Sequence, residues 1–197
     1  MMSVDLDKLN DELKDLNLST DLAFYLGHPH LYVHDCVGYI FEGTSSFYRS
    51  KYPADDMERW RARILNDFYQ ENMSIKLEGI EKVVDLMAYN SLFNYLEKKM
   101  SFQGITFHLF FSPESGESFD LHSDDVAVYL YLLAGEKKLR IEMEQGGSLQ
   151  SLKLTEGEGT LIQKGYLHQV FPHKVKTVAL SIGHNHLGRG VYEGMEI

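Results

Sequence analysis

The sequence VAVYLYLLAGEKKLRIEM, residues 126–143, consists of two runs rich in β-branched, aromatic and leucine residues on either side of the short turn AGE. Such runs are typical of strands, and the glycine between them favours a hairpin. Comparable runs, separated by clusters such as SPESGES and TEGEG, lie on both sides of it: ITFHLFF (105–111), LQSLKL (149–154), GTLIQ (159–163), HQVF (168–171) and TVALSI (177–182). Short strands in this rhythm are typical of a small sandwich or barrel, so we expect the core strands of a β-barrel over residues 103–186.

The residues before the barrel have mainly helical patterns. Leucines at helical spacing predict an amphipathic helix near the N-terminus, which packs either on the domain or on a second copy of the chain: Leu6, Leu9, Leu13 and Leu16. Residues 54–69 and 79–100 also show helical spacing, the first with Trp60 as its core anchor and the second with a break near Asn90. Residues 22–41 are richer in aromatic and β-branched types, and they predict a strand.

The composition excludes several classes of function. The chain has 197 residues, with 19 Lys and Arg against 29 Asp and Glu, and so a formal net charge of −10. A chain this acidic lacks the basic surface that nucleic acids and anionic membranes require, so we expect neither as a partner. No apolar run approaches the roughly 20 residues of a membrane span.

The N-terminus and the cysteine content favour a cytoplasmic protein. The first residues, MMSVDLDKLNDELKD, are acidic and amphipathic, whereas a secretory signal begins with basic residues and continues with an apolar run. The single cysteine, Cys36, cannot form an internal disulfide, as is usual in a reducing compartment. The length favours one domain over residues 1–197, with a largely helical part at 1–102, the barrel strands at 103–186 and a tail at 187–197.

The sequence FDLHSDD, residues 119–125, leads directly into the strand at 126–133 and carries the strongest chemical signal. On an extended backbone, residues two apart point to the same side, so His122 and Asp124 can converge on one metal ion. An imidazole and a carboxylate are two of the three ligands in the facial triad of non-haem Fe(II) oxygenases, and the third is a histidine from elsewhere. His168, in KGYLH at the start of a strand, is the natural candidate, with His184 and His186 in GHNH as competitors for the same position.

Other polar residues leave two interpretations open. Lys137, on the strand after the next turn, is a compact cation suited to an anionic cosubstrate, or it forms a solvated pair with Lys138 beside the hairpin turn. Ser181, on a late strand, either hydrogen-bonds the cosubstrate or bonds to the backbone in the core. A separate group of histidines forms either a second metal site or ordinary surface and packing contacts: His28, His30 and His34.

About half of the chain resembles the core of the JmjC-type, cupin-fold 2-oxoglutarate oxygenases, especially the ribosomal oxygenase branch. The resemblance lies in GITFHLFFSPESGESFDLHSDDVAVYLYLLAGEKKLRIE (104–142), and continues in EGTL (158–161), KGYLH (164–168) and, more faintly, SIG (181–183). It implies a mainly β fold with flanking α-helices: a double-stranded β-helix (cupin or jelly-roll) barrel with a helical N-terminal half and the metal inside one mouth.

The resemblance also implies a set of site residues and an activity. By it, His122, Asp124 and His168 bind Fe(II), and Lys137 holds the distal carboxylate of 2-oxoglutarate. The implied reaction is hydroxylation of a C–H bond in a peptide or protein side chain or a small metabolite, with succinate and CO2 as coproducts. The chain departs from the family where His108 replaces a common Asn and Leu139 a common aromatic residue, and it is too short for the dimerisation and winged-helix regions of the larger ribosomal oxygenases.

Two other functions remain open from the sequence. One is a metal cupin that needs no keto acid, such as a dioxygenase or isomerase that binds its substrate directly to the metal; Lys137 would matter little to it. The other is a non-catalytic barrel that serves as an interaction or dimerisation module, with the N-terminal leucine stripe as its contact. A homodimer is compatible with all three.

Overall fold

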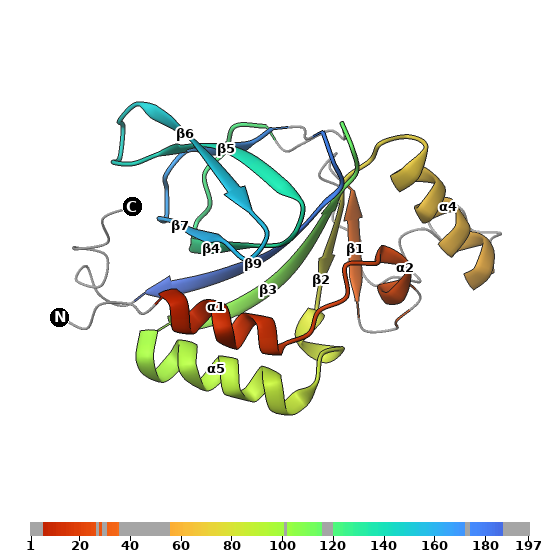
Figure 1. The fold of residues 1–197 in the computed structure, drawn as a ribbon, viewed down its shortest axis with the longest axis horizontal. Helices are drawn as coiled ribbons and strands as arrows, with labels where there is room; N and C mark the ends of the chain where they lie inside the picture. Colours follow the sequence, from red (N-terminus) through yellow and green to blue (C-terminus); the bar gives the residue numbers. More distant parts are fainter. Residues whose placement is uncertain are drawn as a thin grey trace.

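The computed structural model describes residues 6–26, 28, 31–35, 56–100, 102–115, 120–171 and 174–186. Its centre is a pair of antiparallel sheets (Figure 1). Residues of both sheets line a cavity. The six-stranded sheet has the order β1 (Tyr32–Asp35), β2 (Ile75–Glu78), β3 (Phe102–Ser112), β9 (Thr177–His186), β4 (Ala127–Ala134), β7 (Gly159–Ile162). The three-stranded sheet has the order β6 (Leu149–Thr155), β5 (Glu136–Glu142), β8 (His168–Val170).

The chain alternates between the two sheets. After β3 in the large sheet, His122 forms an isolated antiparallel bridge with His168 at the edge of β8 in the small sheet. The chain then supplies β4 to the large sheet, β5 and β6 to the small one, β7 to the large one, β8 to the small one and β9 to the large one. This winding is the double-stranded β-helix, so the predicted fold class is confirmed, and each predicted strand of the barrel is present.

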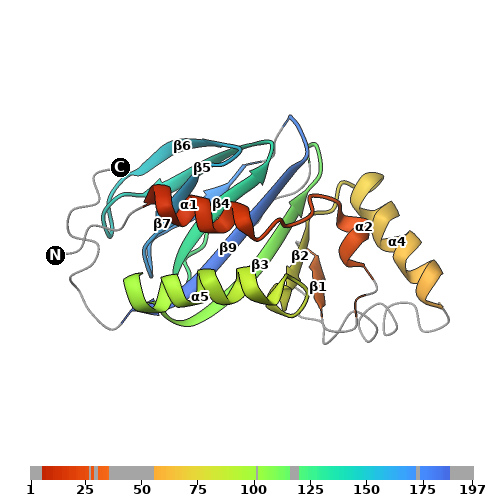
Figure 2. The same ribbon diagram turned by 60° about the horizontal axis from the view of Figure 1, so that its bottom comes forward.

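Helices cover the outer face of the large sheet (Figure 2). α1 (Leu6–Asp15) and α5 (Leu86–Met100) lie across this face, while α2 (Leu22–Tyr25) and α4 (Met57–Tyr69) lie beyond β1. Leu9, Leu13 and Leu16 of the leucine stripe are buried in the core between α1 and the sheet. The stripe therefore packs on the chain's own domain, and is not an exposed contact for a partner. Trp60 of α4 is buried in the same core, as predicted.

Strict alternation along the central strands separates the core from the cavity. Phe107, Leu109 and Phe111 of β3 join the core under the helices, whereas the residues between them face the cavity. On β4, the hydroxyl of Tyr129 donates a 2.9 Å hydrogen bond to Asn10 Oδ1 of α1, so the tyrosine side of this strand faces the helices. Val128, on the other parity, lines the cavity.

Three expectations for the N-terminal half are wrong in whole or in part. The strand predicted within residues 22–41 is present as β1 (Tyr32–Asp35), but residues 22–25 form the helix α2, because Asp21 caps it by accepting a hydrogen bond from Ala23 N. The helix predicted for 79–100 is instead a short 3-10 helix at Ile80–Lys82 followed by α5, which runs unbroken through Asn90. The chain is instead interrupted between the 3-10 helix and α5, where the Asp85 carboxylate caps the first turn of α5 by accepting from Met87 N and Ala88 N.

The third error concerns the small strand β2, which was not expected in the helical half of the chain. It pairs with β3 over Ile75–Glu78 and extends the large sheet beside the cavity. Among the helices in the described part of the chain, none is long and apolar enough to cross a membrane.

Candidate metal centre and the cavity around it

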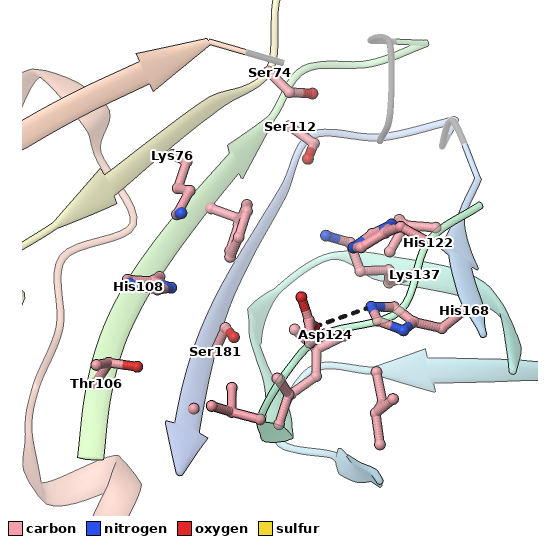
Figure 3. Close-up of a pocket in the computed structure, with 17 residues that line it drawn as sticks. Ser74, Lys76, Thr106, His108, Ser112, His122, Asp124, Lys137, His168 and Ser181 are labelled. Carbon is pink, nitrogen blue, oxygen red and sulfur yellow. Dashed lines mark ion pairs between the residues drawn. The ribbon is translucent and has the colours of Figure 1, made fainter. Parts of the chain in front are cut away.

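Two histidines and one carboxylate converge at one end of the cavity. His122, Asp124 and His168 each offer a ligand atom, and these three atoms all lie within 4.8 Å of one another. His168 Nε2 lies 3.5 Å from Asp124 Oδ2 (Figure 3). Two ligand atoms at about 2.1 Å from one ion are roughly 3 Å apart when they bind at right angles, so this spacing suits a divalent metal after a small closure.

The backbone fixes the three side chains relative to one another. His122 N donates to His168 O at 3.1 Å and His168 N donates to His122 O at 2.8 Å, so the two histidines form a bridge with both hydrogen bonds. Gly165 N donates to Asp124 O at 2.9 Å and holds the turn that carries the carboxylate. The segments that carry the three donors are therefore paired to each other before any metal binds.

Hydrogen bonds to the backbone also orient both imidazole rings. His122 Nδ1 lies 2.6 Å from Asp120 O, and His168 Nδ1 lies 3.2 Å from Tyr166 O. A carbonyl oxygen only accepts, so each ring carries its proton on Nδ1 and has its lone pair on Nε2. This arrangement is common in metal-binding histidines, where the second nitrogen sets the tautomer.

The electrostatic environment favours neutral His168, the form that binds a metal. Burial lowers the pKa of His168, and the neighbouring His122 lowers it further, although the contacts with Tyr166 and Asp124 act in the opposite direction. A neutral imidazole binds a cation without first losing a proton. The donor set and its surroundings therefore fit a divalent metal.

Lys137 is buried beside this cluster. Its parity on β5 is that of the core residues Leu139 and Ile141, and its side chain points into the cavity, whereas Lys138 is exposed. No acidic side chain of the described residues forms an ion pair with Lys137, and burial lowers the pKa of its ammonium group to about 8. The solvated-pair interpretation is thus wrong for Lys137, and a desolvated cation without a counter-ion favours an anionic ligand.

The cavity has a volume of about 310 Å³, and its walls are mainly apolar. Ser181 of β9 lines it, close to the middle of the wall in Figure 3. His184 has the opposite parity on β9 and does not line the cavity, so it is not placed to compete with His168. The side chains of His186 and His34 and all of His30 and Cys36 lie outside the described residues, so the second histidine site remains untested.

Sequence reasoning assigned no role to three polar residues near the site, although it noted His108 as a departure from the family pattern. Lys76 of β2 and His108 of β3 line the cavity wall opposite the metal cluster, and Glu142 of β5 is buried behind His168. Glu142 Oε2 accepts from Leu167 N at 2.9 Å, and Glu142 N donates to Leu167 O at 2.9 Å, which anchors the residue before His168. The alternation IKLE at 75–78 was the available signal for Lys76, but four residues are a short pattern.

Comparison with known proteins gives similarity of shape only. No family model matches the sequence, and no curated protein matches it. Among solved structures, the ribosomal oxygenase YcfD from Escherichia coli aligns with a TM-score of 0.47 and 14% identity over 59% of this chain and 32% of that chain. Oxalate decarboxylase from Bacillus subtilis aligns with a TM-score of 0.41 and 13% identity, over 57% of this chain and 25% of that chain.

A cupin-family protein with a double-stranded β-helix fold from Methanocaldococcus jannaschii aligns with a TM-score of 0.36 and 16% identity, over 42% of this chain and 71% of that chain. The alignment with YcfD covers only about a third of the YcfD chain, 32%. Likenesses of this degree assign no activity, metal or substrate to the chain, and the functional argument rests on its own residues.

Proposed function

We propose that the cavity is the active site of an Fe(II)- and 2-oxoglutarate-dependent oxygenase. The observation that carries this proposal is the pairing of two features in one small cavity. One is the cluster of two histidines and one carboxylate, and the other is the buried Lys137, which has no acidic partner among the described residues. The first is the donor set that non-haem Fe(II) enzymes use, and the second suits a carboxylate.

Each residue has a distinct role in this proposal. His122, Asp124 and His168 would hold the metal from one side and leave its other positions open to small molecules. Lys137 would bind the distal carboxylate of 2-oxoglutarate, and Ser181 would offer a hydroxyl to the same ligand. When bound, Fe(II) and 2-oxoglutarate supply with O2 the oxidising chemistry that hydroxylates a substrate C–H bond and yields succinate and CO2.

The chain's own contribution is binding, orientation and exclusion of water. Val128, Leu130 and Ile162 form an apolar part of the wall. Such a wall keeps the dielectric low around Lys137 and strengthens its attraction to a carboxylate.

An anaerobic titration tests the proposal. The Fe(II)-loaded protein is titrated with 2-oxoglutarate, and the visible charge-transfer band of the chelated keto acid is followed. We expect a saturable band in the wild type, no band in His122→Ala, and strongly weakened 2-oxoglutarate binding in Lys137→Ala. Lys138→Ala is the matched control, because it removes the same charge one residue away on the exposed side of β5.

The alternatives predict other results. Metal binding by the triad without a band would favour a metalloenzyme that needs no keto acid, and equal bands in Lys137→Ala and Lys138→Ala would remove the role proposed for Lys137. Absence of metal binding in the wild type would favour a barrel with an interaction role.

A further inference from the structure

The wall of the cavity that faces the metal cluster carries a second set of polar groups. Lys76 comes from β2 and His108 from β3, and both point into the cavity from the side opposite Lys137 and His168 (Figure 3). Neither has a role in holding the metal or in the contact proposed for the keto acid. Polar groups placed on the far wall are positioned to bind the molecule that is to be oxidised.

One carboxylate, that of Glu78, lies next to both of these groups. Lys76 and Glu78 are two residues apart on β2 and so share a face, and Glu78 lies directly opposite His108 in the register of β2 and β3. Glu78 Oε1 is 2.6 Å from Lys76 Nζ and 3.6 Å from His108 Nε2. Glu78 therefore orients Lys76 through a close ion pair and lies beside His108, so the lysine is positioned before a ligand arrives.

This cluster differs from an ordinary surface ion pair in its burial. The Lys76 and Glu78 side chains are 23% and 32% exposed, whereas those of Lys153 and Glu136, which form a 2.7 Å pair on the small sheet, are 53% and 44% exposed. Partly buried charges have lost some of their contacts with water, and a polar ligand can replace those contacts with hydrogen bonds of its own.

The donors on this wall suit a carboxylate. Lys76 has three N–H donors, and its contact with Glu78 leaves others for a ligand. The hydroxyl groups of Ser112 and Thr106 line the same wall and can also donate. A cavity of about 310 Å³ is at the small end for ligand sites, and in the proposed function it also accommodates the keto acid, so little space remains for the substrate.

We propose that Lys76 and His108 form a second carboxylate-binding position and that the substrate is a small organic acid, held by this group with its carbon chain towards the metal cluster. The identification of this acid as a substrate rests on the proposed function, whereas the binding of a carboxylate at Lys76 does not. Glu78 is a positioning residue that keeps Lys76 oriented.

The test uses butyrate as the probe and butyramide as its uncharged match. The full chain, loaded with redox-inert Zn(II), is titrated with each compound in the presence and absence of saturating 2-oxoglutarate, and the imidazole signals of His108 are followed by NMR. With the keto acid bound, Lys137 is occupied, so further binding reports the far wall. We expect saturable shifts with butyrate and at least about tenfold weaker binding of butyramide.

Variants identify the position. Lys76→Met is expected to weaken butyrate binding about ten- to a hundredfold, and Lys76→Arg, which keeps the charge, to restore it to within a few fold of the wild type. Lys153→Met is the control, because it removes the same charge from a close but more exposed ion pair outside the cavity. Equal butyrate binding in Lys76→Met and the wild type, or equal losses in Lys76→Met and Lys153→Met, would overturn the proposal.

The two proposals fail separately. If 2-oxoglutarate does not bind but butyrate binding depends on Lys76, the carboxylate position stands and the oxygenase proposal falls. If 2-oxoglutarate binds and Lys76→Met leaves butyrate binding unchanged, the reverse holds. A capped peptide with one glutamate side chain that binds more tightly than butyrate would overturn the assignment to a small acid.

Discussion

At the scale of single residues, Lys137 stands out because its charge is buried at a cost to stability. The residue is 3% exposed, and burial lowers the pKa of its ammonium group from 10.5 to about 8. The unfolded chain therefore binds more protons than the folded one between about pH 8 and 10.5, and stability due to this group rises with pH across that window. Below pH 8 the folded protein bears the full penalty.

We predict that Lys137→Met stabilises the protein at neutral pH. The lowering of the Lys137 pKa from 10.5 to about 8 measures the cost of burying the charge. Removing the charge should therefore raise the free energy of unfolding of the variant by up to about 3 kcal/mol at pH 7. Urea denaturation at pH 7, 9 and 10 measures it, and the difference between variant and wild type should shrink as the pH rises. Lys138→Met, on the exposed side, should stay within about 0.5 kcal/mol of the wild type, and equal effects of the two variants would contradict the prediction.

At the scale of elements, the junction between β5 and β8 places one of the metal ligands. The Glu142 carboxylate and backbone N–H anchor both polar backbone groups of Leu167, next to His168. Because the Glu142 side chain is buried, its loss leaves the Leu167 N–H without that acceptor in a low-dielectric site.

Glu142→Ala is expected to lower metal affinity about ten- to a hundredfold, and the free energy of unfolding by about 1–3 kcal/mol. Zn(II) titration with a competing chelator measures the affinity at a temperature where both proteins are folded. Glu142→Gln keeps an acceptor oxygen and should recover most of the affinity. Glu158→Ala is the control, because its carboxylate caps Thr155 N in an exposed turn away from the cluster; an equal loss of affinity there would argue against the positioning role.

The β4–β5 turn is a second element whose backbone is tightly constrained. Gly135 has φ +87°, and a Cβ at this position would lie 2.5 Å from Lys176 O and 3.1 Å from Thr177 Cγ2. Gly157 has a similar φ, +83°, but nothing lies within 4 Å of its Cβ position. The two glycines therefore share the cost of a positive φ and differ only in crowding.

Replacing each glycine by alanine separates the two effects. Gly157→Ala should cost roughly 1–2 kcal/mol for the left-handed backbone alone, and Gly135→Ala should cost a further 1–3 kcal/mol because Lys176 and Thr177 must move. Denaturant midpoints at a common m-value give both numbers. Equal losses in the two variants would show that the turn accommodates the methyl group.

Most of the barrel was predictable because its strands alternate or form short apolar runs between clear turns. His122 and Asp124 were identifiable because they are two residues apart on extended chain. The orientation of Lys137 stayed open in the sequence, although its parity with Leu139 and Ile141, which the structure shows to be buried, was an available signal. The part of the far wall that β2 supplies was not predictable from the sequence, because β2 is four residues long and lies some thirty residues before its partner strand. Only tertiary pairing brings Lys76 to the cavity, and no local pattern reports it.

At the scale of the whole molecule, the two sheets divide the work of building the site. The small sheet and its bridge supply the two histidines and Lys137, and the large sheet supplies Lys76, His108 and Ser181. The helices pack on the opposite face of the large sheet and do not enter the cavity (Figure 2). Binding in the cavity should therefore stabilise the contact between the sheets.

We predict that a divalent metal raises the thermal stability of the whole protein. A ligand that binds only the folded state stabilises it by about 2.7 kcal/mol at a concentration one hundred times its Kd. Calorimetry with and without Zn(II) should show a higher Tm for the wild type and no shift for His122→Ala. His184→Ala, a histidine outside the cavity, is the control, and an unchanged shift in His122→Ala would place the metal elsewhere.

The bridge between His122 and His168 also has a kinetic consequence. A strand represented by one bridge has little cooperative support, so this edge of the small sheet should open by local fluctuation more often than the long ladders. The two residues that form the bridge through their amides also carry the imidazoles of the cluster. A metal ion bound by both imidazoles would therefore add a second link between the same two residues. Their amide protons should then exchange with deuterium quickly in the metal-free protein and slowly in the metal-bound protein. Amide exchange at this edge of the sheet would therefore report metal binding directly.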